Sequence, residues 1–196
     1  MISKTAQAAT AVSVRPAVAS DIPAIAAIYR HHVLTGIASF ETEPPEASEM
    51  LRRFEAVAAL GLPYLVACVD DGVAGYAYAG LYRARPAYRY TVEDSVYVDQ
   101  AYAGAGVGSR LLPALISACA QAGRRQMIAV IGDSANTGSI RLHEKFGFAR
   151  VGLLPAVGYK FGRWVDSVLM QRALGAGDAP LGLIAGDAPA DLPVAG

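Results

Sequence analysis

The feature that most constrains this chain is a strand pattern that runs into a glycine-rich turn. Val92–Asp99 is largely apolar, yet it carries a glutamate, Glu93, and the pattern is typical of a β-strand. Residues 103–109 read Ala-Gly-Ala-Gly-Val-Gly-Ser, and a long apolar helix pattern follows them. The first N–H groups of a helix lack intrahelical partners and lie at the positive end of its dipole, so such a turn can bind a phosphate. A phosphate site beside a carboxylate that can accept a proton indicates group transfer from a phosphate-bearing donor.

The glycine turn has three competing interpretations. A dinucleotide-binding turn has the spacing G-x-G-x-x-G and an acidic residue about twenty positions later. Here the spacing is G-x-G-x-G-S, and residues 124–128 are Arg-Arg-Gln-Met-Ile. A Walker A loop ends in Gly-Lys-Ser/Thr, and this turn has no lysine. A plain strand-to-helix turn stays open on local spacing alone, although the glutamate on the strand and a later helix pattern from Asn136 to His143 favour a functional turn.

The bulk composition restricts the class of protein. The chain has 196 residues, enough for one domain with a real core, and 54% of them are hydrophobic. No apolar run approaches the roughly 18 residues of a membrane span, and we expect no signal peptide at Met1–Val12. Lys+Arg and Asp+Glu are 17 each, so we expect no nucleic-acid partner. Cys68 and Cys119 are expected to be buried thiols in a reducing cytoplasm.

Hydrophobic periodicity predicts one domain between two tails. Residues 1–11 are expected to form a flexible N-terminal tail, residues 12–174 the domain, and residues 175–196 a disordered tail rich in Ala, Gly and Pro. Strands are expected at residues 12–15, 63–69, 73–81, 91–99, 127–131, 148–154 and 165–172. Helices are expected between Asp21 and Gly36 and at residues 46–60, 106–122 and 136–146, the third of them bent at Pro113. This order predicts an α/β domain with a mixed central sheet flanked by helices on both faces.

A series of short motifs then occurs in one order along the chain. They are Phe40-Glu41-Thr42-Glu43-Pro44, Tyr82-Arg83-Ala84-Arg85 with Tyr88, Thr91-Val92-Glu93 with Val96-Tyr97-Val98, the glycine turn, Ala129-Val130-Ile131-Gly132 with Asn136, Arg141-Leu142-His143-Glu144 with Gly147-Phe148, and Gly158-Tyr159-Lys160 with Gly162, Trp164 and Asp166. With these motifs the chain resembles the phosphinothricin/methionine-sulfoximine N-acetyltransferases of the GNAT superfamily, from about Val14 to Leu174. The resemblance implies the GNAT acyl-CoA N-acyltransferase fold, acetyl-CoA as co-substrate and no metal.

The resemblance also implies where acetyl-CoA binds. Backbone groups of Val96, Tyr97 and Val98 are expected to pair with the pantetheine as an added strand would. The pyrophosphate is expected on the N–H groups of the turn, formed by Ala103, Gly104, Ala105, Gly106, Val107, Gly108 and Ser109. The family pattern begins with Gln or Arg where this chain has Ala103 and Gly104, so one side-chain contact to the phosphates is missing and CoA binding should be somewhat weaker. Asn136 matches a CoA-contacting asparagine, and a simple helix N-cap is the alternative.

Two residues match catalytic positions of the family. Glu93 is expected to act as general base, because an amine must lose a proton before it attacks a thioester. The alternative is a strand glutamate that faces solvent or pairs with an arginine. His143 is expected to serve as an acid–base or orienting partner, and the alternative is a hydrogen-bonded core histidine. His31 and His32 are assigned no chemistry.

The substrate is expected to be a small amine that carries a carboxylate. Arginine binds carboxylates in a bidentate manner, so Arg83 and Arg85, near Tyr88, suggest a carboxylate pocket, with a solvated loop as the alternative. By the resemblance, Phe40, Tyr159 and Lys160 line the same pocket.

The predicted activity is N-acetylation of the α-amine of phosphinothricin, methionine sulfoximine or methionine sulfone by direct transfer from acetyl-CoA, in a homodimer. The alternatives are a different amine (a protein N-terminus, a polyamine or an antibiotic) and a non-catalytic acyl-CoA-binding regulator.

Overall fold

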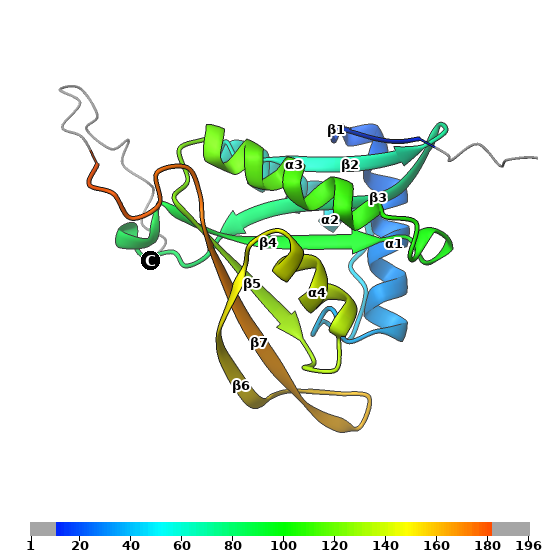
Figure 1. The fold of residues 1–196 in the computed structure, drawn as a ribbon. Helices are drawn as coiled ribbons and strands as arrows, with labels where there is room; N and C mark the ends of the chain where they lie inside the picture. The colour runs from blue at the N-terminus through cyan, green and yellow to red at the C-terminus, as the bar shows by residue number, and fades with distance from the viewer. Residues whose placement is uncertain (1–10, 182–196) are drawn as a thin grey trace, which may run out of the picture.

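The computed structural model describes residues 11–181 and contains one mixed, seven-stranded sheet in the order β1-β2-β3-β4-β5-β7-β6 (Figure 1). The strands are β1 (Val12–Pro16), β2 (Tyr64–Val69), β3 (Gly72–Leu81), β4 (Thr91–Val98), β5 (Gln126–Gly132), β6 (Ala149–Lys160) and β7 (Arg163–Ala173). Short 3-10 turns lie at Ala19–Asp21, Pro86–Tyr88 and Gln100–Tyr102. The predicted fold class is confirmed.

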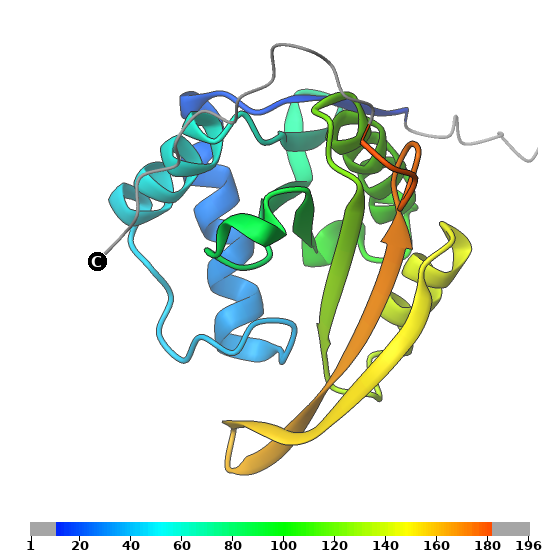
Figure 2. The ribbon, with the colours of Figure 1, turned by 90° about the vertical axis from the view of Figure 1, so that its left-hand side faces the viewer.

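Helices cover both faces of this sheet. They are α1 (Ile22–Thr35), α2 (Ala47–Ala59), α3 (Val107–Gln121) and α4 (Thr137–Lys145). Figure 2 shows α1 and α2 on one side of the sheet and α3 and α4 on the other. The apolar residues at helical spacing, such as Ile25 on α1 and Leu111 on α3, are fully buried against the strands. Pro113 lies inside α3, which continues through it.

The pairing of β4 with β5 positions the site. It is the one parallel pairing in the sheet of residues 11–181, and every other neighbouring pair is antiparallel. Its register runs only from Thr91↔Gln126 to Asp94↔Ala129. Both strands continue beyond that point, β4 to Val98 and β5 to Gly132. The two strands therefore diverge after Asp94, and one edge of β4 is left without a β5 partner.

Close packing brings the start of α3 against the sheet near this gap. A Cβ atom at Gly75 would lie 2.8 Å from the carbonyl oxygen of Tyr97 and 2.9 Å from Cγ1 of Val107. Only glycine leaves that space free, so Gly75 lets the first turn of α3 rest on β3.

The hairpin of β6 and β7 is longer than the sequence pattern predicted. Strands were expected at residues 148–154 and 165–172, whereas β6 extends to Lys160 and β7 begins at Arg163. Phe161 and Gly162 form the turn, both with positive φ, as a tight hairpin of this kind requires. Nearly all of β6 is exposed. Its residues therefore do not alternate between a buried and an exposed face, and the sequence lacks the period-2 pattern that indicates a strand.

The boundary of the C-terminal tail also differs from the expectation. The tail was expected from Gly175, but residues 175–178 form a turn. The Arg125 guanidinium donates hydrogen bonds to the carbonyl oxygens of Gly177 and Ala179, each at 2.8 Å. The rest of the expected C-terminal tail and residues 1–10 of the expected N-terminal tail lie outside the described residues.

Candidate active site

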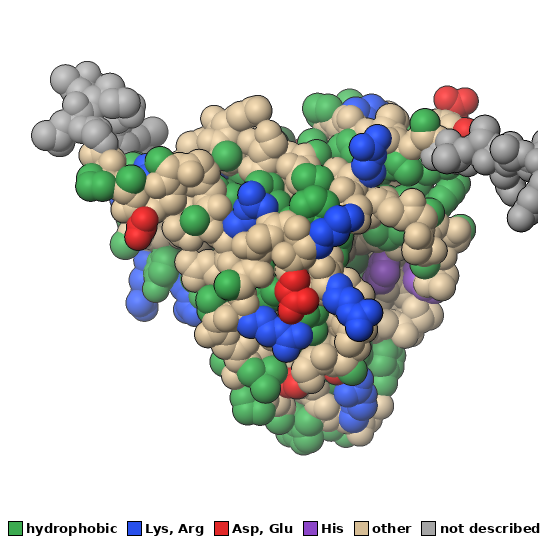
Figure 3. Space-filling view, viewed as in Figure 1, with side chains coloured by type: hydrophobic (Ala, Val, Ile, Leu, Met, Phe, Trp, Pro, Cys, Tyr) green, Lys and Arg blue, Asp and Glu red, His purple; other side chains and the backbone are tan. Residues whose placement is uncertain are grey.

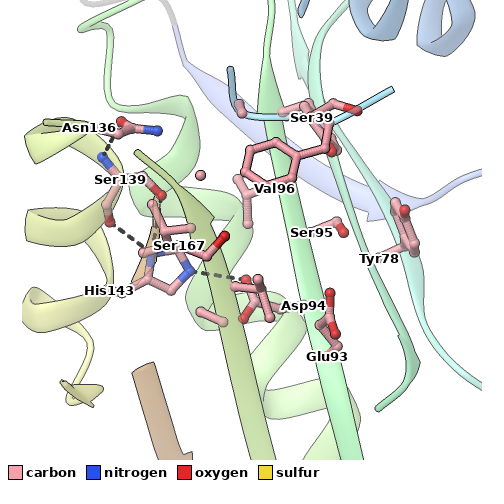
Figure 4. A pocket seen from close by; sticks show the side chains of 17 residues that line it. Ser39, Tyr78, Glu93, Asp94, Ser95, Val96, Asn136, Ser139, His143 and Ser167 are labelled. Atoms are coloured by element: carbon pink, nitrogen blue, oxygen red, sulfur yellow. Dashed lines mark hydrogen bonds and ion pairs between the residues drawn. The ribbon is translucent and has the colours of Figure 1, made fainter. Parts of the chain in front are cut away.

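A cavity of about 300 Å³ opens where β4 and β5 diverge (Figure 4). Its walls come from one stretch of β4, the end of β5, the loop after α1 and the first turns of α4. The lining residues are Ala38, Ser39, Phe40, Tyr78, Glu93, Asp94, Ser95, Val96, Tyr97, Ala129, Val130, Ile131, Gly132, Asn136, Ser139, His143 and Ser167. Among the residues predicted for the site, Phe40, Glu93, Val96, Tyr97, Asn136 and His143 are thus brought together.

The alternation of a β-strand divides the β4 side chains between the two faces of the sheet. Tyr97 packs edge-on against Tyr29 of α1, with ring centroids 5.1 Å apart, so Glu93 shares the α1 and α2 face. Asp94 bonds to His143 of α4, so it lies on the opposite face. Because the strands part here, side chains of both faces reach one cavity.

Glu93 is a half-buried carboxylate with no ion-pair partner in residues 11–181. Burial, and to a lesser extent the negative charge of Asp94, raises the pKa of Glu93 above its ordinary value. A carboxylate with a raised pKa in a cavity is suited to take and release a proton near neutral pH. The alternative of a glutamate paired with an arginine does not apply.

His143 is buried, and both of its ring nitrogens are engaged. Nδ1 lies 2.7 Å from the carbonyl oxygen of Ser139, and Nε2 lies 3.0 Å from Oδ2 of Asp94. Burial alone would lower the pKa of His143, but the hydrogen bond and charge of Asp94 outweigh that effect and the pKa is raised. The sequence reasoning missed Asp94; a second carboxylate in an apolar strand was the signal that could have found it.

The glycine turn lies outside the cavity wall, beyond the end of β4. Gly104 and Gly106 have φ of 78° and 82°, values that glycine adopts without strain. The amides of Ala103 and Ala105 already donate to the carbonyl oxygens of Gln100 and Tyr102. The first N–H groups of α3, from Val107 onward, lack helical acceptors and are the ones that remain for a ligand. The other residues expected to bind phosphate, Gly108 and Ser109, belong to this first turn.

Val98 differs from its neighbours on β4. It does not line the cavity, and its carbonyl oxygen lies 2.8 Å from Nε2 of His32. Burial lowers the pKa of His32, so the neutral ring donates from Nε2 to that carbonyl. His32, to which the sequence assigned no chemistry, therefore holds the end of β4 against α1.

Asn136 begins α4. Its Oδ1 accepts a hydrogen bond of 3.2 Å from the Ser139 amide, so the N-cap interpretation is confirmed. Asn136 also lines the cavity, and a contact with CoA stays a prediction.

The loop after α1 packs against β6 and is hydrogen-bonded to it. The ring of Phe40 packs so closely on Gly158 that a Cβ there would lie 2.9 Å from Cζ of Phe40. The buried ammonium of Lys160 donates to the carbonyl oxygens of Gly36 and Ser39 at 2.8 and 2.7 Å. Lys160 was expected to line the pocket, but it lies behind the wall, where its ammonium is bonded to the carbonyl oxygen of Gly36, the residue that ends α1, and to the carbonyl oxygen of Ser39 in the following loop. It therefore fixes the wall that Ser39 and Phe40 form.

Four more of the expected substrate residues lie outside the cavity wall. Tyr159 is exposed and packs edge-on against Trp164, with ring centroids 5.2 Å apart. Arg83, Arg85 and Tyr88 lie on the exposed loop between β3 and β4, where the Arg83 guanidinium sits 5.1 Å from the ring centroid of Tyr82. This loop leads directly into β4 and so into Glu93.

Several wall residues carried no sequence signal. Tyr78 of β3 faces the cavity because it is paired with Ser95, a register that only the folded sheet fixes. Within residues 11–181, no group of three or more His, Cys, Asp and Glu side chains could hold a metal ion. In the same range, no helix combines the length and the apolar character that crossing a membrane requires.

Comparison with known proteins gives the family. The model of the acetyltransferase (GNAT) family matches residues 25–148. A phosphinothricin N-acetyltransferase of Alcaligenes faecalis is 54% identical over 171 residues, covering 87% of this chain and 87% of that protein. An L-methionine sulfoximine/L-methionine sulfone acetyltransferase of Salmonella typhimurium is 41% identical over 169 residues, covering 86% of this chain and 98% of that protein.

A solved structure agrees with this result. A GNAT superfamily phosphinothricin acetyltransferase from Sinorhizobium meliloti, in complex with AcCoA, matches with a TM-score of 0.85 at 45% identity, covering 90% of this chain and 97% of that one. The chain therefore belongs to the GNAT acetyltransferase family. It is an N-acetyltransferase, and the predicted resemblance is confirmed.

Replacing Lys160 by Met should leave the buried carbonyl groups of Gly36 and Ser39 without a donor. We expect the free energy of unfolding, measured by urea denaturation, to fall by about 1–3 kcal/mol. Lys145→Met, a matched change at an exposed lysine of α4, should stay within about 0.5 kcal/mol of the wild type. Equal stabilities of the two variants would contradict the role given to Lys160.

Proposed function

We propose that this protein transfers the acetyl group of acetyl-CoA to the α-amine of a small amino-acid analogue such as phosphinothricin, methionine sulfoximine or methionine sulfone. The observation that carries the proposal is the half-buried Glu93 on the wall of a cavity that opens at the unpaired edge of β4. The printed names of the two relatives give these amines as their substrates, and the S. meliloti structure contains AcCoA. We place the reaction in the cytoplasm, where the free, buried Cys68 and Cys119 stay reduced.

The residues present fit acetyl-CoA. The pantetheine arm can pair with the open edge of β4 at Val96 and Tyr97, and less at Val98, whose carbonyl oxygen His32 occupies. The phosphates would lie on the first N–H groups of α3, with no side chain from Ala103 or Gly104 to assist. The bound co-substrate supplies an activated acetyl thioester, and every other group in the proposal belongs to this chain.

Glu93 and His143 have separate tasks in this proposal. An α-amine is mostly protonated at neutral pH, so Glu93 takes its proton, directly or through water, before the nitrogen attacks. His143 is bonded at both ring nitrogens, so it is not free to act as a second base. We assign His143 the role of general acid, which gives a proton to the departing thiolate.

Glu93→Gln should lower kcat by about 10²–10⁴, because the neutral amide cannot accept the proton. The affinity for acetyl-CoA, measured by calorimetry, should stay within about twofold. In the wild type, kcat/KM should rise with pH through the raised pKa of Glu93, and this acidic limb should vanish in the variant. Glu55→Gln, on an exposed part of α2, should match the wild type. Equal losses of kcat and acetyl-CoA affinity in Glu93→Gln would show that Glu93 is structural.

The amine is proposed to lie on the α1 and α2 face, between Phe40, Tyr78 and Glu93. Phe40 is exposed enough to touch a ligand, although its ring is anchored on Gly158. The substrate carboxylate would be bound by Arg83 and Arg85 from the loop that enters β4. Tyr88 supports this site because the guanidinium of Arg83 lies over its ring.

Arg85→Ala should raise KM about tenfold or more for amines that carry an α-carboxylate, because a charge-assisted contact is lost. The KM of the matched amine without the carboxylate should not change, nor should the KM of acetyl-CoA. The measurement is thiol release from acetyl-CoA across a panel of amines. The same panel tests the alternatives, since activity only with polyamines or peptides, or none at all, would overturn the proposal.

The β6–β7 hairpin is proposed to bind a second copy of the chain. It carries a group of large apolar residues, spaced along the hairpin, that are mostly more than half exposed. They are Val151 55%, Leu153 53%, Leu154 43%, Val157 53%, Tyr159 60%, Phe161 58% and Trp164 64%. Figure 3 shows hydrophobic side chains at the lower end of the molecule. Monomeric proteins rarely expose large apolar patches to water, and a dimer would cover these residues.

The double change Val157→Lys and Trp164→Lys should convert the dimer to a monomer, because burying two charges at the interface is unfavourable. Sedimentation velocity at micromolar protein measures the state. Leu34→Lys, at a 46% exposed apolar position of α1, is the control and should remain a dimer. A wild-type protein that sediments as a monomer would exclude the proposed assembly.

A further inference from the structure

We infer that Asp94 is a positioning residue that keeps a proton on His143, on the face of β4 opposite to Glu93, for delivery to the departing thiolate. The inference rests on the proposed function and deepens it. Asp94 and Glu93 are neighbours on one strand, so they point to opposite faces of the sheet. Proton removal and proton supply can therefore take place on two sides of one reacting group, without direct proton transfer between Glu93 and His143.

The hydrogen bonds of His143 determine how many protons its ring carries. The Ser139 carbonyl oxygen can only accept, so Nδ1 must donate to it over 2.7 Å. Nε2 then faces Oδ2 of Asp94 at 3.0 Å, and this contact is favourable only with a proton between the two atoms. Imidazole and carboxylate together therefore hold one proton more than a neutral histidine beside a carboxylate would.

The pair is shielded from water yet borders the cavity. The exposed fraction of the side chain is 4% for His143 and 2% for Asp94. The second carboxylate oxygen of Asp94, Oδ1, is buried and has no hydrogen-bond partner among residues 11–181. Asp94 is also the last β4 residue in register with β5, so this oxygen sits where the cavity begins. The pair therefore leaves one carboxylate oxygen without a partner in the described part of the chain, at the edge of the cavity.

Few other titratable groups face the pair. They are Glu93 on the same strand and the buried thiol of Cys119 on α3, whose pKa burial and then the charge of Asp94 raise to about 12. The thiol therefore stays neutral. Ser139 of α4 and Ser167 of β7 line the cavity and do not titrate, and the Phe148 ring packs edge-on against the imidazole, with centroids 5.0 Å apart.

The proton balance of the reaction closes. The ammonium loses one proton to Glu93, the nitrogen forms a bond to the acetyl carbon, and the carbon–sulfur bond breaks with its electron pair on sulfur. The nitrogen loses a second proton to Glu93, and the sulfur takes the proton of the Asp94–His143 pair. Glu93 passes the first proton to water before it takes the second, then passes the second to water as well, and water returns one proton to the pair. The sum is one amide, one thiol and one released proton.

Histidine-selective ¹⁵N NMR tests the inference on the unmodified protein. The chain has only 3 histidines, so the signal that is lost in His143→Phe is that of His143. At pH 7 we expect both ring nitrogens of His143 to carry protons in the wild type. In Asp94→Asn the amide can donate to Nε2, so the ring should become neutral at the same pH. A neutral His143 in the wild type, or a ring that Asp94→Asn leaves unchanged, would overturn the inference.

Kinetics supply the second measurement. Asp94→Asn should lower kcat at least tenfold, leave the KM of both substrates within twofold, and move the alkaline limb of the kcat–pH profile to lower pH. Asp94→Glu should recover part of the rate, and Asp71→Asn, in the exposed β2–β3 turn, should match the wild type. A pH-independent loss that follows the melting temperature would show a structural role only. Failure of the proposed function itself is distinguishable, because the wild type would then acetylate no amine in the panel.

Discussion

The parallel contact between β4 and β5 ends after Asp94↔Ala129, and the rest of the site depends on that early end. Had the two strands stayed paired to Val98 and Gly132, the edge of β4 would carry its usual hydrogen bonds and no cavity would form. The separation leaves backbone groups of β4 available to a ligand, at the point where side chains of both faces of the sheet converge.

The separation also explains why a strand can carry the chemistry. Consecutive residues on a paired strand lie on opposite sides of a sheet and cannot act on one ligand. At the diverging end of β4, Glu93 and Asp94 reach the same cavity from opposite sides. Each has a different environment, since Glu93 is half-buried without a cationic partner and Asp94 is buried against His143. Two carboxylates one residue apart can therefore have different uses.

Much of the fold could be predicted from the sequence, because its strands and helices mostly bury one face. Periodicity located β1 to β5 and all of the helices to within a few residues. It missed the second half of β6, because this strand is exposed along nearly all of its length and shows no alternation of buried and exposed residues. The composition of the tail after Gly175 predicts disorder. Composition gives no information on the hydrogen bonds that Arg125 donates to the carbonyl oxygens of Gly177 and Ala179.

The motifs of the sequence placed some residues on the cavity wall, whereas contacts between distant parts of the chain could not be predicted from them. Glu93, His143, Asn136 and Phe40 all lie on the cavity wall. The contacts of Lys160 could not be predicted, because its partners, Gly36 and Ser39, are 124 and 121 residues away in the sequence. Tyr78 and Ser95 entered the wall through strand register, which no single motif encodes.

The position of Trp164, which packs against Tyr159 on the hairpin, gives the protein an intrinsic fluorescence probe. Trp164 is the only tryptophan of the chain, 64% exposed on β7 and outside the cavity wall. Its emission therefore senses the polarity at the hairpin surface and not the contents of the cavity. Covering the hairpin would shift the spectrum to shorter wavelength, whereas filling the cavity would leave it unchanged, so surface burial and ligand capture can be followed separately without a label.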